Sequence, residues 1–281
     1  MNRFAFLVLI TILVFCQFGV TCVAASEGIS ITREPVAKIT FINPDNAIGF
    51  RVSGDKAFFV DRDGATAKAD LNTGTVKSDN SSLNKVRDFA LNNGNPVFLT
   101  TDATTEGAVD PAWPKGPFGA CRIESESGDA YLMGNDNLVY LPKNATSAVM
   151  IPGLFFAMPI QNGFIYTIRQ ESGTKIWGVE LLDSFGNRMK RIYRFTRDFD
   201  PTGIQLGPIG TEGEVLLSYW SKNQRELALI GQNGRMLWKI PVPKPVCMRD
   251  LGWDAKGNLL VLEKEGGSLV LYRWVFAIPQ G

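Results

Sequence analysis

"VCMRDLGWDAKGNLLVLEKEGGSLVLYRW", from Val246 to Trp274, contains two apolar runs separated by a Glu-Lys-Glu-Gly-Gly segment. Short apolar runs bounded by Gly, Asn and Asp predict β-strands joined by tight turns. A second stretch, "VRDFALNNGNPVFL" from Val86 to Leu99, repeats the Arg-Asp pair, the alternating apolar residues and the Gly-Asn turn. The recurrence indicates a repeated unit and not an isolated hairpin.

The glycine turn recurs at a roughly regular spacing along the chain. A glycine precedes a strongly apolar run at six positions, separated by 40, 40, 29, 50 and 44 residues: Gly54, Gly94, Gly134, Gly163, Gly213 and Gly257. This noisy period is close to the ~40–45 residues of a four-stranded propeller blade. Helical periodicity is nearly absent. We therefore expect an all-β fold, a β-propeller.

The blade count and the closure of the ring follow from the length. Residues 26–281 suit six blades of this size best, and five or seven blades remain alternatives. Propellers often close by joining strands from both ends of the chain in one blade, which protects open sheet edges. We expect Val36–Ile42 and Ser268–Phe276 to make this closure.

Two groups of repeats carry a family resemblance. The stretches "NGRMLWKIPVP" (Asn233–Pro243) and "DLNTGTVK" (Asp70–Lys77) resemble the turn and strand of pyrroloquinoline-quinone-type propeller repeats. The stretch "LGWDAKGNLLVLE" (Leu251–Glu263) resembles the inner strands of NHL and gluconolactonase-type propellers. The resemblance covers most of residues 26–281 at the level of the repeat. It implies the architecture and no particular activity.

The first 25 residues have the pattern of a secretory signal. A short polar start with Arg3 precedes the apolar run Phe4–Val20, and small residues follow, so we expect cleavage after Ala25. An uncleaved N-terminal membrane anchor is the alternative. We expect residues 26–281 to be a single propeller domain, secreted or periplasmic, without a further membrane span.

The composition excludes several functions. Lys and Arg total 29 against 28 Asp and Glu, and no basic stripe appears, so we expect no nucleic-acid partner. The chain contains no histidine, which removes Ser-His-Asp and Cys-His catalysis and histidine-bound metals. We expect no cofactor.

Two cysteines follow the predicted signal, Cys121 and Cys247. An exported compartment permits a disulfide between them. The alternative is two free thiols that pack as small apolar residues.

Repeated Arg-Asp pairs are the main candidate ligand-binding residues. They are Arg87 with Asp88, Arg197 with Asp198, and Arg249 with Asp250, and Asp254 follows the third pair. At the mouth of a propeller channel, such arginines could bind an anion as forked donors. The alternative, which we favour because the pair is repeated, is that neighbouring blades use these side chains to satisfy buried backbone groups.

Two further features bear on function. "DRDGATAKADL", Asp61–Leu71, starts like a calcium-binding EF-hand loop but has Asn72 at the twelfth position, where a glutamate is required, so a tight turn explains it. We assign no metal site. Trp113 lies in a Pro- and Gly-rich loop, where it could anchor a partner or fold back over a blade.

No complete catalytic set is apparent. We therefore expect an exported, non-enzymatic propeller that acts as a binding or scaffold module for a protein or cell-envelope partner. The alternative is a calcium-dependent hydrolase or lactonase that uses carboxylates at the central channel.

Overall fold

The computed structural model describes residues 23–24, 29–80, 85–100, 105–106, 119–123, 129–134, 137–143, 148–152, 157–159, 165–195, 200–221, 224–242 and 247–277. Only the backbone is described at residues 23–24, 79–80, 105–106, 159 and 200–202. Most of the predicted signal segment therefore lies outside the described residues, as do three candidate site residues, Trp113, Arg197 and Asp198. Among the described residues, no helix is long and apolar enough to cross a membrane.

The described strands form antiparallel sheets, four of which have four strands that are consecutive in the chain. The first contains β3 (Ala47–Ser53), β4 (Lys56–Asp61), β5 (Ala65–Asp70) and β6 (Val76–Asn80). The next contains β10 (Ala120–Ile123), β11 (Ala130–Met133), β12 (Asn137–Leu141) and β13 (Val149–Pro152). The third contains β14 (Ala157–Pro159), β15 (Ile165–Gln170), β16 (Trp177–Leu182) and β17 (Arg188–Arg194). The fourth contains β18 (Asp200–Ile209), β19 (Val215–Ser221), β20 (Gln224–Ile230) and β21 (Met236–Val242).

Two further sheets depart from this pattern. One has three described strands, β7 (Val86–Asn92), β8 (Asn95–Thr100) and β9 (Thr105–Glu106). The other joins both ends of the chain in the order β1–β2–β24–β23–β22, with bounds Val23–Ala24, Ser30–Ile39, Ser268–Ala277, Leu259–Glu265 and Leu251–Trp253. A 3₁₀ turn, η4 (Met248–Asp250), leads into β22.

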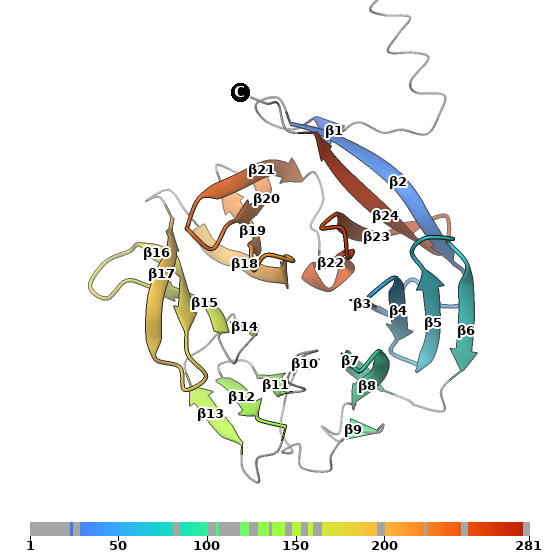
Figure 1. Cartoon of the computed structure of the whole chain (residues 1–281), viewed down its shortest axis with the longest axis horizontal. Helices are drawn as coiled ribbons and strands as arrows, with labels where there is room; N and C mark the ends of the chain where they lie inside the picture. The colour runs from blue at the N-terminus through green and yellow to red at the C-terminus, as the bar shows by residue number, and fades with distance from the viewer. Residues whose placement is uncertain are drawn as a thin grey trace, which may run out of the picture.

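The sheets are arranged in a ring around a centre (Figure 1). The strands β3, β7, β10, β14, β18 and β22 lie nearest to this centre, and the outer strands follow radially. The chain is therefore an all-β β-propeller built of repeats, as predicted. Five sheets are full blades of four or five strands, one fewer than the six expected, and the sheet β7–β8–β9 has three described strands.

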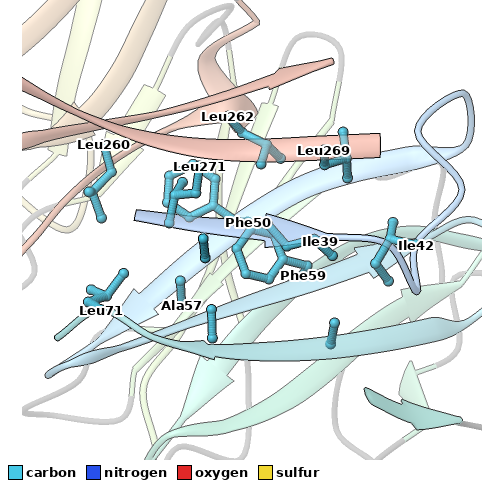
Figure 2. Packing of buried hydrophobic residues seen from close by; sticks show 13 residues of the cluster. Ile39, Ile42, Phe50, Ala57, Phe59, Leu71, Leu260, Leu262, Leu269 and Leu271 are labelled. Carbon is cyan, nitrogen blue, oxygen red and sulfur yellow. The ribbon is translucent and has the colours of Figure 1, made fainter. Parts of the chain in front are cut away.

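Strands from both ends of the chain close the ring, as predicted, although the N-terminal strand spans Ser30–Ile39 and not Val36–Ile42. β2 runs antiparallel to β24, with Ile31 opposite Phe276 and Ile39 opposite Leu269. Between this sheet and the sheet β3–β6 lies a buried apolar cluster that includes Phe50 and Phe59 (Figure 2). The first and last strands of the domain thus share one core with its first full blade.

The Asp-x-x-Gly turns link strands within the sheets. Asp61 Oδ1 accepts hydrogen bonds from the amides of Asp63 and Ala65, and Gly64 adopts φ +87°. These local hydrogen bonds confirm the turn predicted for Asp61–Leu71. The Asp side chain binds backbone amides, and glycine supplies the positive φ that the turn requires.

Candidate binding site in the central channel

A cavity of about 560 Å³ lies at the centre of the ring. Its wall comes from the C-terminal ends of the inner strands β3, β7, β10 and β18 and from β22. The apolar lining includes Phe50, Leu91, Ile123 and Trp253, and the indole Nε1 of Trp253 donates to the carbonyl of Pro208 at 3.0 Å. Adjacent strand ends of five sheets therefore build one pocket, and the blades supply its rigid frame.

Two arginines in this wall flank one buried carboxylate. Asp88 on β7 is fully buried, and its Oδ1 accepts a hydrogen bond from Arg51 Nη2 of β3 at 2.6 Å. Its Oδ2 accepts from the amide of Cys121 at 2.9 Å and lies 3.6 Å from Arg122 Nη1 of β10. A single carboxylate thus connects three neighbouring sheets. Its charge-assisted hydrogen bonds offset the free-energy cost of burying its charge.

Arg249 adds a third guanidinium to the channel. It lies in η4, and it donates to the carbonyl of Arg87 at 3.2 Å and to the carbonyl of Gly119 at 2.6 Å. This arginine therefore satisfies backbone carbonyls that belong to two other sheets. Together with the Asp88 bond to the Cys121 amide, these contacts are what the structural interpretation of the Arg-Asp repeat predicts.

The electrostatics of the channel are dominated by these arginines. Burial, followed by repulsion from Arg51, lowers the pKa of Arg122 to about 10, and the attraction of Asp88 opposes this. Burial raises the pKa of Asp250 to about 6, although Lys264, Arg249 and Arg51 favour its charged form. The channel therefore contains more positive than negative charge at neutral pH.

A close backbone contact positions η4 at the channel. Gly49 of β3 adopts φ +124°, and a Cβ at this position would lie 2.3 Å from the carbonyl oxygen of Arg249. Only glycine allows β3 to approach η4 this closely. The contact places Met248 and Arg249 beside a second cavity of about 250 Å³, to which Arg122 also contributes.

A third cavity, of about 590 Å³, lies at the N-terminal ends of β7 and β10, beside the turn after β4. It is lined by Arg62, Lys85, Arg87 and Arg249, with Asp63 as the acidic residue. The predicted residues Arg87 and Arg249 therefore both line this cavity, whereas Asp88 is fully buried and lines neither this cavity nor the central one.

The other predicted site residues have different positions. Asp254 lies in the turn between β22 and β23, where its carboxylate accepts from the amides of Lys256 and Asn258 and from Arg273 Nε, each at 2.9 Å. These bonds support a structural turn and not a ligand contact. Arg197, Asp198 and Trp113 lie outside the described residues, so their predicted roles stay predictions.

The disulfide that the compartment would permit is not present, because Cys121 and Cys247 are both free. Cys121 is fully buried among apolar residues that include Val97 and Leu132, and burial raises the pKa of its thiol. Cys247 is exposed at the start of η4. The alternative of free thiols was therefore correct, although only Cys121 packs as a buried apolar residue.

Sequence reasoning missed Arg51, Arg122 and Trp253 as members of the site. Both arginines stand between apolar residues in an inner strand, as Phe-Arg-Val and Cys-Arg-Ile. A charged residue inside such a run, a few residues before a turn, is the signal that could have singled them out.

The donor set does not fit the calcium site of the alternative function. Among the described residues, no group of three or more acidic or cysteine side chains converges in a way that could hold a metal ion. Asp88 is engaged by two arginines, and Asp254 is engaged in its turn. Calcium requires six to eight oxygen ligands without competing cations.

Comparison with known proteins agrees at the level of the fold. No protein-family model matches the sequence, and a search of curated proteins found no match. An auxiliary nutrient binding protein from Bacteroides thetaiotaomicron has 9% identity and a TM-score of 0.52, with 90% of this chain and 79% of that chain covered. A gluconolactonase candidate has 10% identity and a TM-score of 0.53, covering 87% and 92%. Hydrazine synthase of Kuenenia stuttgartiensis has 12% identity and a TM-score of 0.52, covering 79% and 75%.

The ring of sheets and the central cavity define the chain as a β-propeller repeat protein. The three similar proteins differ in function, and at 9–12% identity their likeness concerns the fold alone. A function for this chain must therefore be argued from its own channel.

Proposed function

We propose that this protein is an exported, non-enzymatic binding module whose ligand occupies the central cavity. The observation that carries the proposal is the 560 Å³ cavity built by the ends of the inner strands. Its volume lies within the range of small-molecule sites, roughly 300–1,000 Å³, and its wall combines apolar side chains with polar groups that can orient a ligand. The cavity also offers a docking point for part of a protein or cell-envelope partner.

The architecture proposed for this module is a six-bladed ring. The three-stranded sheet β7–β8–β9 would count as the sixth blade, because β7 contacts β3 on one side and β10 on the other. Support for export is the apolar segment Phe4–Val20 followed by small residues. Cleavage after Ala25 would remove β1 and leave the pairing of β2 with β24 in place.

Export has a direct test. The full-length chain, expressed in a bacterial host, should appear in the periplasm or medium with a mass that corresponds to a start at Ser26. Retention of the full mass in the membrane fraction would support the anchored alternative and contradict cleavage.

The binding function is tested by a thermal-shift screen with small organic anions, cations and neutral compounds. A ligand at 100 times its dissociation constant should raise the melting temperature by about 5 °C or more. Ser53→Trp should abolish the shift, because Ser53 lines the cavity. Ser78→Trp is the matched control on the exposed surface of β6, and it should preserve the shift.

Two outcomes would contradict the binding function. One is a screen in which no compound stabilises the native chain. The other is stabilisation that Ser53→Trp leaves unchanged.

The calcium-dependent lactonase alternative has its own test in the same thermal-shift assay. We expect calcium and a chelator to change the melting temperature by less than about 1 °C, and a clear calcium-dependent rise would favour that alternative.

A further inference from the structure

We propose that the ligand of the central cavity is a small organic anion with an apolar body, whose acid group binds Arg122 in the field of Arg51. This inference rests on the proposed binding function and adds the chemical class of the ligand. It is carried by the position, exposure and bonding of the two arginines and by the apolar wall beside them.

Arg122 has donors available for an anion. Its Nη1 donates to the carbonyl of Cys121 at 2.9 Å, and its nearest carboxylate oxygen, of Asp88, is 3.6 Å away. Its side chain keeps 25% of its surface exposed, and it lines both the 560 Å³ and the 250 Å³ cavities. A guanidinium carries five N–H donors, so most of them stay open toward the cavities.

Arg51 reinforces the positive charge beside Arg122. Its two terminal nitrogens bind Asp88 and the carbonyl of Phe50, and its buried Nε has no hydrogen-bond partner. Asp88 therefore compensates one of the two cationic charges that flank it. Removing an arginine from water without an equivalent anion is costly, and a bound acid group would supply the missing negative charge.

The rest of the cavity favours an apolar ligand body. Val52, Leu91, Ile123, Ile209 and Leu251 line the cavity together with the arginines, and acidic side chains do not occur in the described lining. A carboxylate or sulfonate attached to a hydrocarbon or aromatic group matches this arrangement. A free inorganic anion would leave the apolar wall unused, and a cation would be repelled.

The test compares two fluorescent probes with the same apolar body. One is 8-anilinonaphthalene-1-sulfonate, which is anionic, and the other is N-phenyl-1-naphthylamine, which is neutral. Titration of the folded protein should show one saturable site, with at least tenfold tighter binding of the sulfonate, because charge-assisted hydrogen bonds provide a difference of this size. Ser53→Trp should abolish both signals.

Charge-removing variants assign the effect to Arg122. Arg122→Met should weaken sulfonate binding about tenfold and leave the affinity of the neutral probe unchanged, whereas Arg122→Lys should retain part of the sulfonate affinity. Arg235→Met, at an exposed turn between β20 and β21, is the matched control and should change neither affinity. Melting curves verify that each variant is folded.

The possible outcomes separate this inference from the proposed function. Equal affinities of the two probes for the native protein would overturn the anion proposal even if Arg122→Met failed to fold. An unchanged sulfonate affinity in folded Arg122→Met would overturn it as well. Cavity binding of the neutral probe or of a cation alone would reject the anion and keep the binding module. A cavity that binds neither probe nor any compound of the screen would reject both.

Discussion

Asp88 shows how one residue connects several blades. Its fully buried carboxylate binds Arg51 of β3 and the Cys121 amide of β10. The repeat predicted contacts with backbone groups of neighbouring blades, and Asp88 and Arg249 make such contacts, whereas Arg197 and Asp198 lie outside the described residues. It did not identify Arg51 or Arg122, because a single arginine in a strand looks the same whether it faces the channel or, like Arg188 on β17, the solvent. Only the closed ring brings these separate strands together.

The thiols give a test at this scale. We expect the folded mature chain to react at one cysteine with a thiol reagent, because Cys247 is exposed while Cys121 is buried with a raised thiol pKa. Both should react in denaturant without a reductant. Cys247→Ser should remove the fast reaction, and a denatured chain with no reactive thiol would instead reveal the disulfide.

Asp250 gives a pH-dependent test. Because its pKa is raised to about 6 in the folded chain from an ordinary 3.8, the folded state binds the proton more tightly, and the contribution of Asp250 to stability falls as pH rises from about 4 through 6. Asp250→Asn should therefore unfold with a free energy about 1–2 kcal/mol higher than the native chain at pH 7.5. The two proteins should be equally stable near pH 4. Urea unfolding at both pH values measures this, and an equal difference at both would refute it.

At the scale of the elements, alternation and turn chemistry predicted most of the architecture. The strands around the Asp-x-x-Gly turns and the closure of β2 on β24 are where the pattern placed them. The blade count was harder to predict, because it was read from the spacing of the glycine turns along the sequence. Insertions between turns change this spacing without changing the number of strands. The sequence predicts one such insertion at the Pro- and Gly-rich segment that contains Trp113, which lies outside the described residues.

The closure can be tested through its buried core. Ile39 on β2 is fully buried between the closing sheet and the sheet β3–β6 (Figure 2). Ile39→Ala should lower the free energy of unfolding by about 2–5 kcal/mol, because it leaves a cavity in this core. Phe41→Ala, at a side chain 53% exposed, should change it by less than about 1 kcal/mol. Equal effects in urea unfolding would show that β2 does not hold the ring closed.

At the scale of the whole molecule, the closed ring brings residues at the ends of separate strands together into one site. Between two and five residues of each of five sheets line the central cavity, and the arginines lie close together because the inner strands converge on the centre of the ring (Figure 1). The lack of histidine excluded several chemistries from the sequence alone. The ligand class could be proposed only from the arrangement of side chains, because the structure places arginines and apolar residues in the wall of one cavity.

Displacement of the bound sulfonate probe by straight-chain alkanoates tests the central claim most directly. We predict that affinity rises about threefold to fourfold per added methylene from butanoate to octanoate, because each enters the apolar part of the cavity. Octanol should displace the probe at least tenfold more weakly than octanoate, because it lacks the charge that Arg122 binds. Equal potency of octanol and octanoate, or displacement that does not depend on chain length, would contradict the account.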